Sequence, residues 1–95
     1  MKNYPYPLTV VMDRYSGTYS GGYFTAWNKY PEEIPSCIDD SDGIAMDFWD
    51  NYHKKEKALK DGSQMVGFGE TADAAINDLI AKQMRKGVFG GVYND

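Results

Sequence analysis

The residues best suited to chemistry lie in one glycine- and serine-rich segment near the N-terminus. It reads Asp13-Arg14-Tyr15-Ser16-Gly17-Thr18-Tyr19-Ser20-Gly21-Gly22. Backbone N–H groups in such a turn can surround an anion, an arginine can clamp a phosphate, and tyrosine rings can stack on a base. The alternative is a plain turn in which glycine supplies a positive φ and the tyrosines cover a sheet. The expected ligand contacts here are Arg14, Tyr15, Ser16, Tyr19, Ser20, Gly21 and Gly22.

Two aromatic stretches extend this expected site. Trp27-Asn28 follows the turn, and Phe48-Trp49 lies further along with Tyr52. Neighbouring residues on a helix point about 100° apart, so Phe48 and Trp49 are not expected to face the same core equally. One of them is available for a partner, unless both serve the core of a small domain. We include Trp27, Asn28 and Trp49 among the expected ligand contacts.

Catalytic and metal-binding patterns are not found. Gly67-Phe68-Gly69-Glu70-Thr71-Ala72 has the spacing of a dinucleotide fingerprint but lacks the βαβ unit, so a strand end followed by a Thr71 helix cap explains it better. The acidic residues between Asp39 and Asp50 lack the spacing of a calcium loop. The spacing of His53 and Cys37 suggests no nucleophile–base pair. We therefore expect no enzymatic activity, no metal and no cofactor.

Bulk properties exclude several classes of protein. The chain has 95 residues, a single cysteine and a net charge of -4, which indicates one domain and disfavours binding to a nucleic-acid backbone. No apolar run approaches the roughly 20 residues that span a bilayer, and the N-terminus has no signal-peptide pattern. One cysteine fits a reducing compartment. We expect a cytoplasmic protein without a membrane partner, and a homo-oligomer because so small a core gains stability by association.

Local patterns predict a small α+β domain. Strands are expected over 8–15, 23–28 and 63–68, with the first two forming a hairpin around the glycine-rich turn. Apolar residues at helical spacing predict helices over about 42–54 and between Thr71 and Gly87. The tail over 88–93 is either a last edge strand or an arm that contacts another subunit. The predicted order is β-β-α-β-α(-β), an antiparallel sheet packed against two helices on one face.

Some segments resemble HicB-like antitoxin domains. They are Gly21-Gly22-Tyr23, Glu33-Ile34-Pro35-Ser36-Cys37 and the stretch from Gly69 to Leu79. The resemblance implies a partial RNase-H-like sheet without catalytic carboxylates, and oligomers. This chain departs from the family in the helix around Phe48-Trp49 and in having no DNA-binding extension.

The overall pattern is also similar to small proteins carried by phages and mobile elements. It includes the glycine-rich turn, Ala26-Trp27, Asp47-Phe48-Trp49 and Gly67-x-Gly69-x-Thr71. This similarity favours a non-enzymatic counter-defence protein that sequesters a small nucleotide immune signal. The alternative is an inhibitor of a host nuclease or effector, or a HicB-like antitoxin that binds a toxin protein.

Overall fold

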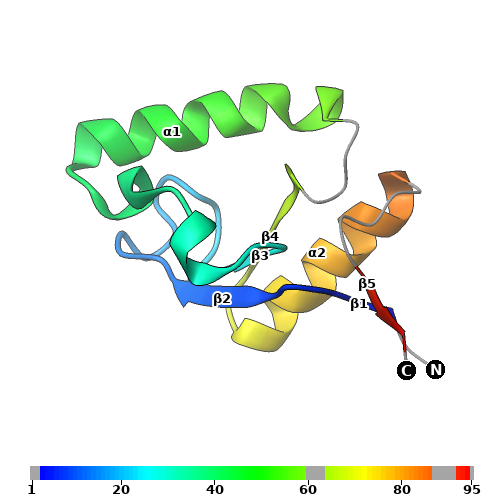
Figure 1. The fold of residues 1–95 in the computed structure, drawn as a ribbon. Helices are drawn as coiled ribbons and strands as arrows, with labels where there is room; N and C mark the ends of the chain where they lie inside the picture. The colour runs from blue at the N-terminus through cyan, green and yellow to red at the C-terminus, as the bar shows by residue number, and fades with distance from the viewer. Residues whose placement is uncertain (1–2, 60–63, 87–91, 95) are drawn as a thin grey trace.

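A three-stranded antiparallel sheet lies at the centre of the computed structural model, which describes residues 3–59, 64–86 and 92–94 (Figure 1). This confirms the predicted small α+β fold and its β-β-α-β-α order. Short 3-10 turns occupy Pro31–Glu33, Ser36–Asp39 and Glu56–Ala58. The other elements are β1 Asn3–Pro5, β2 Thr9–Met12, β3 Phe24–Trp27, α1 Asp42–Lys55, β4 Val66–Gly69, α2 Ala72–Lys86 and β5 Val92–Asn94.

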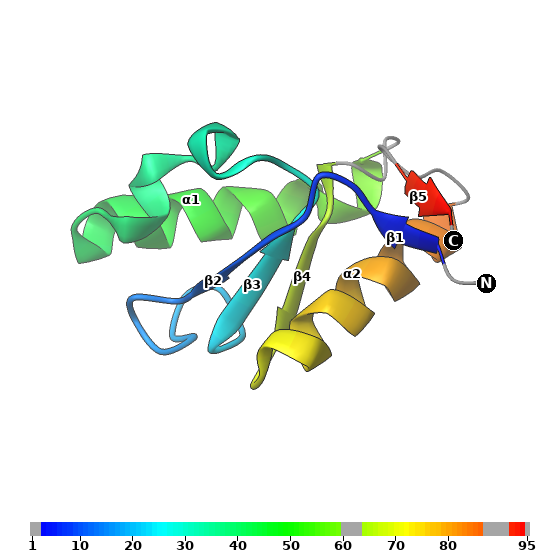
Figure 2. The same ribbon diagram turned by 60° about the horizontal axis from the view of Figure 1, so that its bottom comes forward.

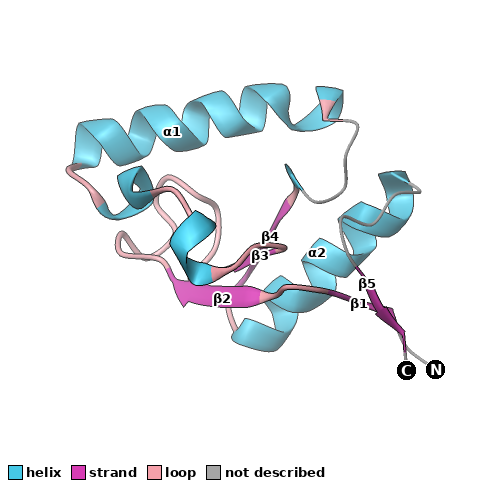
Figure 3. Cartoon of the chain, viewed as in Figure 1, coloured by secondary structure: helices cyan, strands magenta, loops and turns pink. Residues whose placement is uncertain are grey.

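The sheet has the strand order β2-β3-β4, and both pairings are antiparallel. Val11 lies opposite Thr25, and Thr25 lies opposite Phe68. The predicted hairpin is therefore confirmed, with strands shorter than expected because the chain leaves the sheet at Asp13. Figure 3 shows the long pink loop that joins β2 to β3.

The two helices cover opposite faces of the sheet, so the expectation that both lie on one face is wrong (Figure 2). Alternate residues of β3 explain this arrangement. Phe24 and Ala26 pack in the cluster with α2, whereas Trp27 packs in the cluster with α1. Side chains of a strand alternate between its two faces, and β3 is apolar on both. Each face therefore needs its own helix.

On the face toward α2, β4 contributes glycines. A Cβ atom at Gly67 would lie 2.1 Å from the Ala75 carbonyl oxygen, and one at Gly69 would lie 2.5 Å from the Ala75 nitrogen. The glycines of the fingerprint-like segment thus allow strand and helix backbones to approach closely, with no cofactor involved. Thr71 accepts a hydrogen bond on its Oγ1 from the Ala74 N–H at 3.1 Å, which confirms the predicted helix cap.

The face toward α1 is aromatic. Trp49 on α1 is 1% exposed and stands 5.7 Å from the Trp27 ring and 5.4 Å from the Phe68 ring. Asp42 in the first turn of α1 and basic residues in its last turn complement the helix dipole. The helix spans 14 residues and is held by this layer of rings.

A separate two-stranded ribbon joins the ends of the chain. β1 pairs with β5, and Tyr4 lies opposite Tyr93. The sequence analysis did not predict β1, because Pro5 and Pro7 mark a strand boundary there. The tail strand predicted over 88–93 is realised at 92–94, while 88–91 lies outside the described residues. Neither described helix is long and apolar enough to cross a membrane.

Candidate functional site

The glycine-rich turn between β2 and β3 is organised around the buried carboxylate of Asp13. Its Oδ2 accepts hydrogen bonds from the Tyr15 N–H at 3.1 Å and from the Gly17 N–H at 2.6 Å. Ser16 and Gly17 have φ values of 56° and 85°, in the left-handed region. The turn is therefore a preformed loop closed by its own aspartate.

The backbone donors of this turn point inward. The N–H groups of Thr18 and Gly21 donate to the carbonyls of Tyr15 and Gly17, and the Gly22 N–H donates to Ser20 Oγ. A shallow hollow of about 140 Å³ remains, with the acidic Glu70 in its lining. Internal hydrogen bonds therefore use several of the backbone donors that the anion cradle was expected to offer. The lining residues are Ser16, Gly17, Gly21, Gly22, Tyr23 and Glu70.

Arg14, Tyr15 and Tyr19, three of the expected ligand contacts, lie next to one another. The Arg14 guanidinium carbon lies 5.6 Å from the centre of the Tyr15 ring, and the Tyr15 and Tyr19 rings meet edge to face at 5.4 Å. Arg14 Nη1 also donates to the Asp39 carbonyl at 2.6 Å, and the Tyr15 hydroxyl donates to the Asp40 carbonyl. These polar contacts dock the turn against the segment that precedes α1.

Ser20, Asn28 and Trp49, three of the expected ligand contacts, are buried in this structure. Ser20 is 0% exposed, and its carbonyl lies 2.9 Å from His53 Nε2. Asn28 donates to the Pro7 carbonyl at 2.8 Å and accepts from Gln83 Nε2 at 3.1 Å. Trp49 is enclosed by other rings. All three side chains act in the interior, since folding leaves them almost no accessible surface.

A second hollow, which we call the aromatic groove, lies along α1 and has a volume of about 370 Å³. Its floor and walls are largely apolar, and two lysines and two amides are at its rim. Trp27 contributes to it although only 2% of the residue is exposed. The lining residues are Trp27, Lys29, Pro35, Phe48, Asn51, Tyr52, Lys55, Leu59, Gln64 and Val66.

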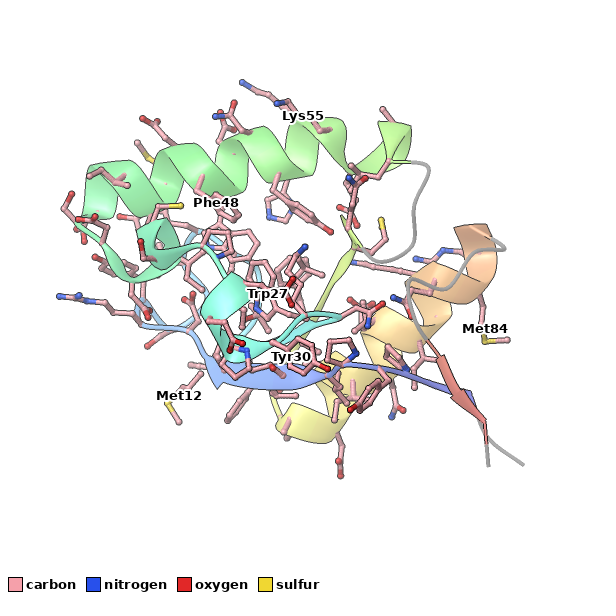
Figure 4. All side chains as sticks on the ribbon, viewed as in Figure 1. Met12, Trp27, Tyr30, Phe48, Lys55 and Met84 are labelled. Carbon is pink, nitrogen blue, oxygen red and sulfur yellow. The ribbon has the colours of Figure 1, made fainter. Side chains whose placement is uncertain are left out.

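Helix α1 and strand β3 position much of the aromatic groove. Phe48, Tyr52 and Lys55 follow one another at helical spacing along one side of α1. Trp27 comes from the end of β3, and its ring centre lies 6.4 Å from that of Phe48 (Figure 4). The Trp27 Nε1–H donates to Thr25 Oγ1 at 2.8 Å, which holds the indole in place. The groove is thus preformed by packing.

Lys29 and Lys55 are among the groove residues that were not predicted as ligand contacts. The i, i+4, i+7 spacing of Phe48, Tyr52 and Lys55 is the signal that could have revealed one wall. Lys29 carried no such signal, because its approach to α1 depends on the tertiary fold.

A third hollow, of about 440 Å³, has Lys82 in its lining, and the ammonium group of this residue is bound by the protein. This group donates to the Val66 carbonyl at 2.9 Å and pairs with Glu56 at 3.0 Å and Asp78 at 3.2 Å. It also lies 4.4 Å from the centre of the Phe68 ring. Because its charge is already balanced by two carboxylates, Lys82 serves to join α2 to β4.

Groups for metal binding are not gathered in the described residues. Over 3–59, 64–86 and 92–94, no cluster of three or more histidine, cysteine, aspartate or glutamate side chains is placed to hold a metal ion. Cys37 is a half-buried free thiol. His53 lies 3.8 Å from Glu56 and bonds to the turn, which gives it a structural contact.

Comparison with known proteins assigns no family to this chain. It matches no protein-family model, no curated protein and no solved structure. The similarity to HicB-like domains and to phage proteins therefore stays a prediction. Functional inference rests on the aromatic groove and the surfaces around it.

Proposed function

We propose that the protein is a non-enzymatic binding protein that captures a small nucleotide-type ligand in the aromatic groove. The observation that carries this proposal is the combination of an aromatic floor with two rim lysines. The half-buried rings of Phe48 and Tyr52 suit a planar base, and buried Trp27 supports the Phe48 ring from below. Lys29 and Lys55 suit a phosphate, since an ammonium group binds phosphate as a point charge.

The size and charge of the groove agree with such a ligand. Ligand pockets measure roughly 300–1,000 Å³, and the groove is at the lower end of this range. The chain has a net charge of -4, so two lysines beside an apolar floor form a local positive site on an acidic protein. Asn51 and Gln64 at the rim can read the polar edge of a base.

The biological role that we propose is sequestration. A protein that holds a nucleotide immune signal without cleaving it lowers the free concentration of that signal. Such a role fits a phage-type counter-defence protein, and it requires affinity but no catalytic group. The proposed ligand class is the one that the sequence predicts. The proposed contacts differ, because they line the aromatic groove and not the glycine-rich turn.

Native mass spectrometry with a panel of cyclic and ADP-ribose-derived nucleotides tests the proposal. We expect the mass of the protein to increase by the mass of a bound nucleotide. The nucleotide should be released chemically unchanged when the protein is heated. The variant Lys55→Glu should weaken binding at least about tenfold, because it reverses one rim charge. Lys54→Glu is the matched control, since Lys54 pairs with Asp50 at 3.0 Å and is not part of the groove. Equal losses in both variants, or no binding across the panel, would contradict the groove assignment.

A protein inhibitor is the second candidate function. Ile44 and Met46 near the start of α1 are 46% and 49% exposed, so this end of the helix presents two apolar side chains to solvent. Both lie outside the lining of the aromatic groove. A stoichiometric protein partner that is lost with Ile44→Asp and retained with Lys55→Glu would favour this function over ligand capture. The reverse pattern would favour the nucleotide-type ligand.

A further inference from the structure

The two edges of the three-stranded sheet are treated differently by the rest of the chain. Along β4, side chains occupy the backbone groups that point away from β3. The Val66 N–H donates to the Tyr52 hydroxyl at 2.8 Å, and the Phe68 N–H donates to Asp78 Oδ2 at 2.9 Å. The Val66 carbonyl accepts from Lys82. This edge is therefore closed to another strand.

The register shows which groups of β2 point outward. The Asp13 N–H donates to the Tyr23 carbonyl, so this pair bonds across β2 and β3. Hydrogen-bonded and non-hydrogen-bonded pairs alternate along an antiparallel ladder. The backbone N–H and C=O groups of Val11 and Thr9 therefore also point toward β3. Strand β4 leads independently to this assignment. The Phe68 N–H points away from β3, so the backbone groups of its partner Thr25 point toward β2 and bond with Val11. The N–H and C=O groups of Val10 and Met12 thus face away from the sheet.

No side chain is recorded on these outward groups of β2 within the described residues, where β2 has a neighbouring strand on one side only. Its sequence, Thr-Val-Val-Met, contains no charge and no proline. Natural edge strands usually carry such protective residues. Met12 is 69% exposed and projects from β2 in Figure 4. An uncharged, uncapped edge with an exposed apolar side chain is a surface for strand pairing.

We propose that β2 pairs with β2 of a second copy of this chain, antiparallel and about a two-fold axis at Val11. The strand is complementary to itself in this register. Val10 of each copy lies opposite Met12 of the other and exchanges both backbone hydrogen bonds with it. The two Val11 side chains meet on the axis. All of these cross-strand pairs are apolar, so association buries Met12 without burying a charge.

Analytical ultracentrifugation of the full chain tests the association. We expect the wild type to form a dimer at concentrations of about 100 μM or below. Met12→Lys should weaken dimer formation at least about tenfold, because it places two charges in the new edge pairing. Met84→Lys is the matched control: it changes a methionine that is 64% exposed on α2, far from β2, and should leave the dimer unchanged. A monomeric wild type, or a Met12→Lys variant as dimeric as the control, would overturn the proposal.

Cysteine cross-linking tests the register in a Cys37→Ser background. A non-hydrogen-bonded antiparallel pair has Cα atoms about 4.5 Å apart, within the range that a disulfide bridges. Val11→Cys should therefore oxidise to a covalent dimer that reduction reverses. Met12→Cys should not, because the two Met12 positions are offset along the strands by more than a disulfide spans. Cross-linking through position 12 in place of position 11 would overturn the axis at Val11.

Discussion

Each face of the sheet is covered by one helix, and the residues at the two contacts differ in size. Toward α2, glycine and alanine let the helix backbone lie against the strand backbone. Toward α1, two tryptophans and several other rings hold the helix further out. Close packing of small residues excludes any guest, whereas bulky rings meeting at angles leave a groove beside them. The aromatic groove therefore lies on the aromatic face, which is the face where we propose that the ligand binds.

The small-residue face should be the more sensitive of the two to added volume. Gly67→Val places a side chain where even a Cβ atom would lie 2.1 Å from the Ala75 carbonyl oxygen, so α2 has to move. We expect a loss of more than about 3 kcal/mol in the free energy of unfolding, measured by urea denaturation. Gly43→Ala is the control, because nothing lies within 4 Å of its Cβ position. It should stabilise α1 by up to about 1 kcal/mol.

The aromatic face should be sensitive to lost volume. Trp49→Ala removes a ring that is 1% exposed, and we expect a cost of about 3–5 kcal/mol. Trp49→Phe should cost only about 1–2 kcal/mol. The reason is that the Trp49 Nε1–H has no hydrogen-bond partner in the described part of the structure, so phenylalanine removes an unsatisfied donor. Equal costs for both variants in thermal unfolding would show that this N–H is satisfied.

The aromatic face also makes stability depend on pH at the alkaline end. Burial raises the pKa of Tyr52 well above its ordinary value of 10.0. The folded state therefore keeps this hydroxyl protonated at a pH where the unfolded chain ionises. Its contribution to stability is fully present below pH 10 and falls above it, by up to about 1.4 kcal/mol per pH unit.

The variant Tyr52→Phe isolates this effect. At neutral pH it should be about 1 kcal/mol less stable than the wild type, since the Val66 N–H loses its acceptor. Above pH 10 the two unfolding free energies should converge, because only the wild type loses stability through this hydroxyl. If the difference between the two unfolding free energies stayed constant with pH, Tyr52 would have the same pKa in the folded and unfolded states.

The variant Phe48→Leu should have the smallest effect on stability, so it tests ligand binding separately from folding. Phe48 is half-buried and lines the groove. Phe48→Leu keeps an apolar side chain of similar volume, so we expect less than about 1.5 kcal/mol of destabilisation. Loss of the ring should weaken ligand binding by about 1–3 kcal/mol, measured by calorimetry with the nucleotide found by mass spectrometry. Unchanged affinity would place the ligand elsewhere.

Local chemistry in the sequence was enough to predict the elements. The β-branched run at β2, the glycine-rich turn, the Thr71 cap and the apolar spacing of both helices each depend on neighbouring residues. The same is true of the contact between Arg14 and Tyr15, which are adjacent in the chain. The proline-flanked β1 was missed, because its partner is at the opposite end of the chain.

Only the tertiary structure decided how these elements combine. The sequence left open which helix covers which face, because β3 is apolar on both sides. It also favoured Asn28 and Trp49 as ligand contacts, whereas packing against Gln83 and Phe68 buries them. The meeting of Lys29 and Lys55 beside Trp27 likewise has no local cause. Side-chain types and spacings determine local hydrogen bonding and periodicity, but burial and distance follow from contacts between segments far apart in the chain.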